Sequence, residues 1–186
     1  MKVNIQRLAF DGIRLIRPNR ISDSRGYFAE MYVRRDFAAV GIEQEFIQEN
    51  ESRSHAAGTV RGLHFQVPPF AQSKLVRVLR GRILDVVVDL RRSSPSYGKH
   101  ITVELSEAAG DQLLVPAGFA HGFCTLEPGS TVLYKVDNLY SAAHDRGVHW
   151  ADPRLAIEWP VSAAEAVISE KDQGLPQFCN LPGYFD

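Results

Sequence analysis

Short apolar runs separated by turn residues occupy most of this chain, and their even spacing is the strongest constraint on its fold. The runs are four to eight residues long and rich in Val, Ile, Leu and Phe, and the separators between them contain Gly, Pro and Ser. This pattern predicts an all-β sandwich or barrel and disfavours strands that alternate with long helices. The expected strands are 75–79, 83–90, 100–105, 112–115, 122–126 and 131–137.

Helical signals are weak, and only two short peripheral helices are expected, at 35–40, where Gly41 would end the helix, and at 162–167. A length of 186 residues fits one domain. We divide it into an N-terminal arm over about 1–50, a barrel over about 51–160 and a C-terminal tail over 161–186. The arm is more polar than the rest, and it could be a flap or could pair with a second subunit.

Composition narrows the classes of function. The net charge of −1 gives no basic field that would favour nucleic acid. No apolar run approaches the length of a membrane span, and the charges near the start leave no apolar core for a secretory signal. Cys124 and Cys179 have no metal-binding spacing. We therefore expect a cytoplasmic protein with no nucleic-acid or membrane partner.

Two stretches about fifty residues apart, RGLHFQ at 61–66 and PAGFAHGF at 116–123, resemble the two signature motifs of the cupin β-barrel. This resemblance refines the expected fold class to an all-β, cupin-like jelly roll with an N-terminal arm and short peripheral helices.

The metal ligands of a cupin are only half present. The usual set is His-x-His with a Glu, followed by a later His. Gln66 replaces the second His, and the sequence PPF at 68–70 stands where the Glu is expected. A divalent ion needs three or four ligands, so His64 and His121 alone would hold one poorly. We expect no metal.

Proton chemistry is the alternative that the nearby residues support. His64 is a base suited to neutral pH, Lys74 could stabilise an oxyanion, and Tyr134 could act as an acid. Asp172 could raise the basicity of His64 if the tail folds back. Each of the four also has an ordinary interpretation, as a structural histidine, a surface lysine, a buried tyrosine and a surface carboxylate.

Further residues suggest an anionic ligand that contains a ring. Arginine forms bidentate contacts with phosphate, and aromatic side chains can stack on a base. The candidates are Arg25, Arg53 and Arg61 for phosphate, Phe28, Tyr140 and Trp150 for stacking, and Gln48 and Asn50 for polar edges. The chain has no GxGxxG or GxxxxGK[ST] loop, which disfavours a Rossmann or P-loop site.

A dozen ordered motifs between about Ile21 and Asp172 resemble those of the dTDP-4-dehydrorhamnose 3,5-epimerase family. They include DSRGYFAE at 23–30, QEN at 48–50, RGLHFQ at 61–66, QSKLV at 72–76, DVVVDLR at 85–91, SPSYG at 94–98, PAGFAHGF at 116–123 and SEKD at 169–172. The resemblance implies a metal-free, cupin-like homodimer that needs no cofactor and acts on a dTDP-4-keto-6-deoxyhexose.

The resemblance also implies roles for single residues. His64 matches the catalytic base, Asp172 its carboxylate partner and Tyr134 the proton donor on the opposite face of the sugar. Lys74 matches the residue that steadies the enolate at the C4 carbonyl. The implied substrate-binding residues are Arg25, Phe28, Glu30, Gln48, Asn50, Arg61, His121, Tyr140, Asp145 and Lys171.

Two details qualify this assignment. Arg25, Phe28 and Glu30 would lie on an arm near the dimer interface and serve the site of the neighbouring subunit. Asp145 and Ala151 depart from the family, in which Glu and Asn are common at these positions. Neither departure falls on the expected proton-transfer residues.

The expected reaction is epimerisation at C3 and C5 of dTDP-4-dehydro-6-deoxy-D-glucose to dTDP-4-dehydro-L-rhamnose, through an enolate. Three alternatives stay open from the sequence. They are an epimerase of antibiotic-sugar synthesis that acts at one carbon only, a metal-dependent cupin such as a dioxygenase, and a non-catalytic nucleotide-sugar binder.

Overall fold

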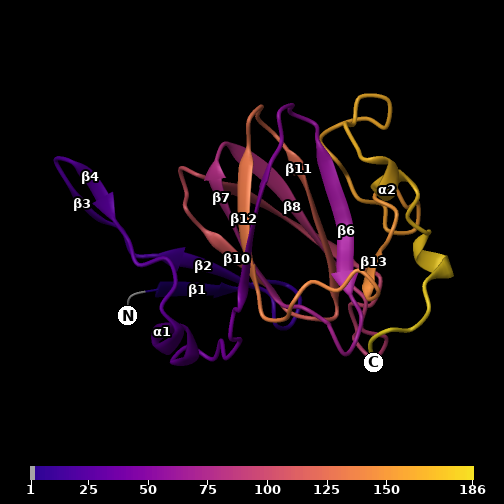
Figure 1. Cartoon of the computed structure of the whole chain (residues 1–186), viewed down its shortest axis with the longest axis horizontal. Helices are drawn as coiled ribbons and strands as arrows, with labels where there is room; N and C mark the ends of the chain where they lie inside the picture. The colour runs from indigo at the N-terminus through magenta and orange to yellow at the C-terminus, as the bar shows by residue number, and fades with distance from the viewer. Residues whose placement is uncertain (1–2) are drawn as a thin grey trace.

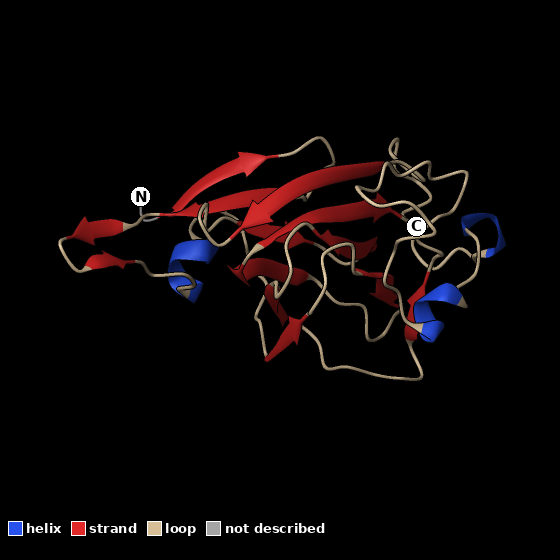
Figure 2. Ribbon diagram, turned by 90° about the horizontal axis from the view of Figure 1, so that it is seen from above, coloured by secondary structure: helices blue, strands red, loops and turns tan. Residues whose placement is uncertain are grey.

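Two antiparallel sheets face one another in the computed structural model, which describes residues 3–186 (Figures 1 and 2). The six-stranded sheet has the order β1 (Val3–Arg7), β2 (Arg14–Pro18), β10 (Gln112–Val115), β7 (Lys74–Arg80), β12 (Thr131–Val136) and β5 (Gln48–Arg53). The five-stranded sheet has the order β13 (Asp145–Gly147), β6 (Val60–Gln66), β11 (Phe119–Thr125), β8 (Arg82–Asp89) and β9 (His100–Ser106). The expected all-β class is confirmed, as two separate sheets.

Smaller elements lie at the periphery. They are the hairpin of β3 (Ile21–Asp23) and β4 (Gly26–Phe28), the helices α1 (Arg34–Ala38) and α2 (Glu170–Gln173), and the 3-10 turn η1 (Phe178–Asn180). None of the helices described between residues 3 and 186 is both long and apolar enough to span a bilayer.

The main core lies between the two sheets. Val76 and Val132 of the six-stranded sheet pack in one buried cluster with Val87 and Phe123 of the five-stranded sheet. Side chains alternate between the two faces of a strand, so the neighbours of an inward residue point outward. Val86, on the opposite face from Val87, belongs to a second buried cluster.

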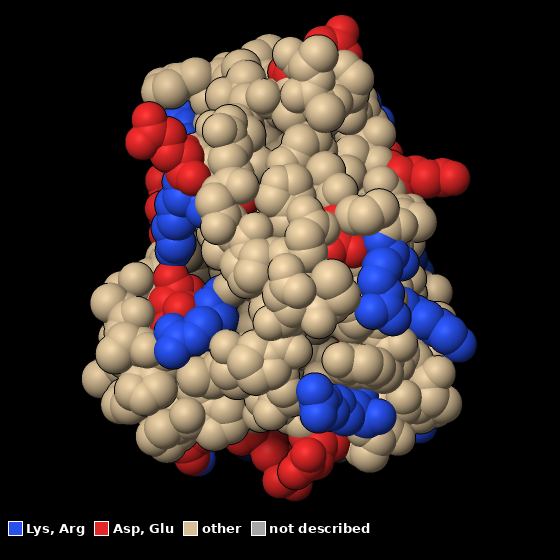
Figure 3. Space-filling model, turned by 90° about the vertical axis from the view of Figure 1, so that its right-hand side faces the viewer, with Lys and Arg blue, Asp and Glu red and all other residues tan. Residues whose placement is uncertain are grey.

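The C-terminal tail explains why β8 and β11 are apolar on both faces. Leu155 and Phe178 are buried in the second cluster with Val86 and Leu63, and further tail side chains pack against it. The tail therefore covers the outer face of the five-stranded sheet, and the exposed surface on that side carries few charges at its centre (Figure 3). This cover brings residues from the end of the sequence next to β6.

The N-terminal segment consists of two different parts. β1 and β2 extend the six-stranded sheet through the pairing of β2 with β10. The β3–β4 hairpin instead projects away from the body of the molecule (Figures 1 and 2). The part of the segment that resembles an arm is therefore this hairpin.

All six strands expected from the sequence are present, as β7 to β12, and α1 overlaps the helix expected at 35–40. The helix expected at 162–167 is wrong, because only residues 163–165 form a turn and no helix follows it. Val167 forms a bridge with Thr59, and its amide donates to the Gly58 carbonyl. This extended pairing ends the helical turn that begins at Ser162.

A buried carboxylate fixes the loop between β8 and β9. Asp89 accepts hydrogen bonds from the backbone and guanidinium of Arg91 at 2.8 to 3.0 Å and from Ser94 and Ser96 at 2.6 and 2.7 Å. Burial by itself would raise the pKa of Asp89, but these donors outweigh it and lower the pKa to about 2.

We predict that Asp89→Asn lowers the free energy of unfolding by about 2 kcal/mol at neutral pH. The contribution of a carboxyl with a depressed pKa is complete above its ordinary pKa of about 4, and it is lost as the pH falls through about 2. Urea unfolding between pH 7 and pH 2 measures the difference between parent and variant, which should shrink below pH 4.

Glu104→Gln is the matched control, because Glu104 pairs with Arg82 at 3.1 Å on the exposed surface. Its effect should stay below about 1 kcal/mol. A difference for Asp89→Asn that is constant from pH 7 to pH 2 would contradict the proposed origin of this stability.

Candidate active site

Strand alternation aims three of the predicted residues into the space between the sheets. On β6, Leu63 and Phe65 pack outward under the tail, so His64 projects inward. Lys74 on β7 and Tyr134 on β12 come from the facing sheet. Two hollows of about 210 and about 290 Å³ both have these three side chains and Lys171 in their walls, so they are two halves of one cavity.

His64 and Asp172 form a hydrogen-bonded pair at the wall of this cavity. The distance from His64 Nε2 to Asp172 Oδ1 is 2.7 Å, and Asp172 Oδ2 accepts from the Gly62 amide at 3.1 Å. Burial would raise the pKa of Asp172, but the bond and charge of His64 and the bond from Gly62 lower it overall. An ionised carboxylate can only accept, so Nε2 carries the proton and Nδ1 is the basic nitrogen of His64.

Two glycines make room for this pair. A Cβ atom on Gly62 would lie 2.6 Å from the Cα of Gly122 on β11, a distance that no side chain tolerates. The β6–β11 register shifts at this point, between His121 and Phe123. Gly62 therefore has no cross-strand partner in this ladder, and its amide is free to bind Asp172.

Lys74 provides a positive charge beside His64, with Nζ donating to the His64 carbonyl oxygen at 3.1 Å. Burial lowers the pKa of Lys74 to about 8, partly offset by the negative charges of Asp145 and Asp85. Burial also raises the pKa of Tyr134, against the opposing charge of Arg61. Tyr134 is therefore a neutral phenol at physiological pH and can donate a proton.

A second buried pair adjoins the same cavity, which His121 lines. His121 Nε2 is 2.9 and 3.0 Å from the two oxygens of Asp85, which is fully buried. Burial raises the pKa of Asp85, while His121 and then Lys74 oppose the rise. Asp85 was not among the site residues predicted from the sequence, although a lone carboxylate in the apolar run ILDVVV was a signal for it.

The remaining walls contain most of the predicted substrate-binding residues. Gln48 donates to Asn50 at 2.9 Å and accepts from the Tyr140 amide at 3.1 Å, and Lys171 pairs with Asp145 at 2.6 Å. All five line the smaller half of the cavity.

The larger half of the cavity is lined by Arg61 and His121. The guanidinium of Arg61 donates to Ser54 Oγ and to the Arg53 carbonyl, each at 3.1 Å. The Arg53 side chain lines neither half, although the sequence proposed it for phosphate.

Three predicted binding residues lie elsewhere in this chain. Arg25 and Phe28 belong to the projecting hairpin, Glu30 follows it, and none of the three lines either half of the cavity. Arg25 pairs with Asp23 at 2.6 Å, and Phe28 is 66% exposed. One copy of the chain does not bring these residues to His64.

Trp150, suggested from the sequence as a stacking residue, lies outside this cavity. It is 6% exposed and packs against Trp159, in a cluster with Val60 and Cys124. It lines neither half of the cavity around His64, so the suggested stacking role has no support at this site. The local sequence did not reveal that the tail covers this indole.

Gln66, at the position of the second cupin histidine, is committed to the backbone. Its amide nitrogen donates to the carbonyls of Phe70 and Leu139 at 2.7 and 3.1 Å, and its oxygen accepts from the Ser141 amide at 2.6 Å. These bonds join two loops at the cavity mouth. Within residues 3–186, no three His, Cys, Asp or Glu side chains are grouped as a metal site.

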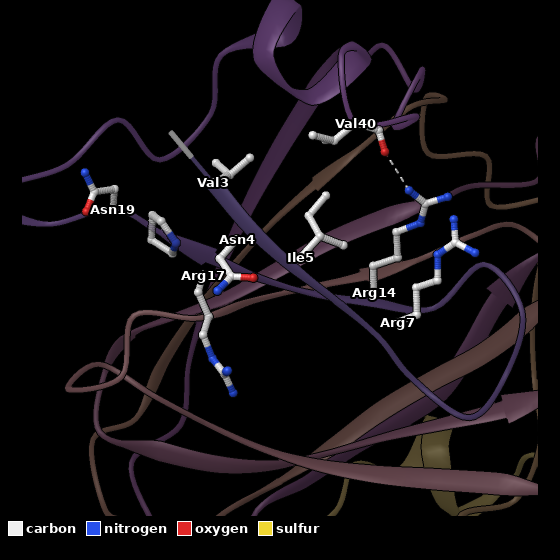
Figure 4. Close-up of a pocket in the computed structure, with 9 residues that line it drawn as sticks. Val3, Asn4, Ile5, Arg7, Arg14, Arg17, Asn19 and Val40 are labelled. Carbon is white, nitrogen blue, oxygen red and sulfur yellow. Dashed lines mark hydrogen bonds between the residues drawn. The ribbon is translucent and has the colours of Figure 1, made fainter. Parts of the chain in front are cut away.

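A larger hollow of about 800 Å³ lies on β1 and β2, away from these residues (Figure 4). Its walls include Arg7, Arg14 and Arg17, and Arg14 donates to the Val40 carbonyl at 2.9 Å. It has no base, acid or carboxylate among its lining residues, so size alone would select the wrong place. The chemistry identifies the cavity around His64.

A two-sheet, cupin-like fold with His64, Lys74 and Tyr134 at one cavity fits the isomerase class, and comparisons with known proteins show this class. The family model for dTDP-4-dehydrorhamnose 3,5-epimerase matches residues 7–180. The enzyme of that name from Sinorhizobium fredii is 50% identical over 184 residues, which are 97% of this chain and 92% of that protein.

Solved structures agree with the sequence match. The Bacillus anthracis dTDP-4-dehydrorhamnose 3,5-epimerase, with TDP and PPi bound, has a TM-score of 0.92 and 46% identity over 95% of this chain and 99% of that one. The Legionella pneumophila enzyme, in complex with dTDP-4-keto-L-rhamnose, has a TM-score of 0.91 and 36% identity over 97% of this chain and 95% of that one.

This chain belongs to the dTDP-4-dehydrorhamnose 3,5-epimerase family. The family resemblance and the cupin-like fold expected from the sequence are therefore confirmed.

The electrostatics of the cavity predict the titration of Lys74. We expect the ammonium of Lys74 to titrate near pH 8. NMR of ¹³C-dimethylated lysines would measure this titration, and the signal that is lost in Lys74→Arg would be assigned to Lys74. Asp85→Asn should lower this pKa further, because a negative charge that favours the protonated amine is removed. Lys171 is the internal control, since Asp145 raises its pKa. A Lys74 signal that titrates with ordinary lysines would contradict its burial.

Proposed function

We propose that this protein epimerises C3 and C5 of dTDP-4-dehydro-6-deoxy-D-glucose to give dTDP-4-dehydro-L-rhamnose, and that it does so as a cytoplasmic homodimer. One observation carries the proposal beyond family membership. His64, held by Asp172, and Tyr134 enter one cavity from opposite sheets, with Lys74 beside them. The ligands named for the two solved relatives support the class of substrate.

Inversion next to a ketone needs a base on one face of the ring and an acid on the other. Nδ1 of His64 would remove the proton from the carbon next to the C4 carbonyl, and the electron pair would move to the carbonyl oxygen as an enolate. The Lys74 ammonium would stabilise that oxygen. Tyr134 would then protonate the carbon from the opposite face. After His64 has released its proton to solvent and Tyr134 has regained one, a second cycle would invert the other carbon.

A general base and a general acid together can supply a large part of the rate enhancement. A positioned general acid or base contributes about 100- to 10,000-fold to a rate. The Asp172 carboxylate stabilises the imidazolium that forms when His64 takes the proton, as the aspartate of a catalytic triad does. Neither a hydride donor nor an oxidant is needed, because the substrate and product have the same oxidation state.

Binding would use the two halves of the cavity. Arg61, in the larger half, is suited to the diphosphate because a guanidinium forms bidentate contacts with phosphate. Gln48, Asn50 and Tyr140 offer polar and aromatic contacts in the smaller half. The projecting hairpin would bring Arg25, Phe28 and Glu30 to the cavity of a second subunit, which accounts for their distance from His64 in one chain.

Deuterium incorporation tests the reaction. With dTDP-4-dehydro-6-deoxy-D-glucose in D2O, the parent should label C3 and C5, read by mass spectrometry and NMR. His64→Ala should lose at least about 100-fold in labelling rate. Tyr134→Phe should still exchange protons on the His64 side but form inverted product about 100-fold more slowly.

The alternatives predict different labels. Deuterium at one carbon only would move the assignment to a single-site epimerase. No label above the enzyme-free control would reject the catalytic proposal and leave a binding protein. A His64→Ala variant that labels at the parent rate would remove His64 from the role of base.

Mixing two inactive variants tests the hairpin. Arg25→Ala and His64→Ala, each of low activity, are unfolded together and refolded as mixed dimers. If the hairpin serves the partner's site, half of the dimers regain one intact site, and about a quarter of the parent activity returns. If the hairpin serves its own site, no activity returns. Sedimentation of the parent as a fully active monomer would also refute the proposed dimer.

A further inference from the structure

The segment after α2 packs on β13, the strand that pairs with the His64 strand β6. Gly147 of β13 pairs directly with His64 of β6. Residues that face each other across two strands project to the same face of the sheet. A Cβ atom on Gly147 would lie 2.6 Å from Leu175 Cδ1 and 2.8 Å from Leu175 Cδ2. The Leu175 side chain therefore occupies the place of a β13 side chain, on the face from which the His64 ring projects.

Leu175 follows Asp172 by three residues, and a backbone turn links the two. The Leu175 amide donates to the Asp172 carbonyl at 3.4 Å, so the backbone turns between them. On the far side, the Pro176 carbonyl accepts from the His149 amide at 2.8 Å. The chain thus leaves Asp172, places Leu175 against Gly147, and is then bonded to His149, two residues beyond the end of β13.

Besides the Gly62 amide, which holds the Asp172 carboxylate itself, the other contacts of α2 are weaker candidates for fixing its place. The helix has four residues, too few to be stable alone, and its Ser169 cap acts within the helix itself. The Lys171–Asp145 pair reaches across to β13, but the Lys171 side chain is 59% exposed. Exposed ion pairs are screened by solvent and contribute little. An apolar side chain seated on a buried glycine is not screened in this way.

We propose that Leu175 is a positioning residue for the base: seated on Gly147, it holds Asp172 against His64 and keeps water from their hydrogen bond. This inference rests on the proposed role of the His64–Asp172 pair. Leu175 would not touch the reacting atoms and would act only through Asp172.

Three variants separate positioning from general stability. Leu175→Ala should lower kcat about 10- to 100-fold, because misplacement by about 1 Å can cost that much, while KM stays within about twofold. Leu175→Met, of similar volume, should restore most of kcat. Leu181→Ala is the matched control, because Leu181 lies in the same tail but packs on the outer core. It should leave kcat unchanged in the folded protein.

A double-mutant cycle shows whether Leu175 acts through Asp172. On an Asp172→Asn background, Leu175→Ala should cost less than about threefold, because the contact that it positions is already lost. An equal loss on both backgrounds would overturn the proposal, since it would show that Leu175 supports the fold in general.

A proton signal makes the test independent of turnover. The His64 Nε2 proton, donated to Asp172, should give a downfield NMR line in the parent that Asp172→Asn removes. In Leu175→Ala this line should broaden through exchange with water, and in Leu175→Met and Leu181→Ala it should remain. An unchanged line in Leu175→Ala would overturn the positioning role. If the parent proved inactive toward the proposed substrate, this NMR measurement would still decide whether Leu175 positions Asp172 against His64.

Discussion

The contact between His64 and Asp172 is the constraint on which the arrangement of this site depends. It joins residues 108 positions apart in sequence, at a distance of 2.7 Å. A carboxylate is stable at this buried place only because His64 and the Gly62 amide satisfy it. The tail therefore has to cover the five-stranded sheet in one fixed position. Its packing against the apolar outer faces of β6, β8 and β11 sets that position.

The cavity has an ordered distribution of charge. Lys74 carries a positive charge with a lowered pKa, and the carboxylates of Asp85 and Asp145 surround it without a direct bond to its ammonium among the described contacts. Asp85 is held by His121, and Asp145 by Lys171. A lysine in such surroundings keeps its proton at neutral pH and can still respond to charge that develops on a bound oxygen. The same groups therefore support both binding and chemistry.

Gln66 supports one wall of the cavity through its side-chain amide. In this chain the cupin position after His64 holds Gln66, whose amide joins the loops at 70 and 139–141 through three hydrogen bonds. These loops carry Tyr140 to the smaller half of the cavity. A residue that looked like a missing ligand in the sequence is thus a support for the substrate-binding rim.

Strand periodicity in the sequence determined the all-β class and six of the strands, because alternation is a local property. It did not predict β6, the strand that carries His64. The residue types suggested Tyr134, Lys74 and Asp172, the family motifs implied their roles, and the structure brings them to one cavity. The tertiary structure alone decided the rest. It buried Trp150, turned 162–167 away from a helix and paired Asp85 with His121. It also seated Leu175 on Gly147. These outcomes depend on which distant surfaces meet, and no short stretch of sequence contains that information.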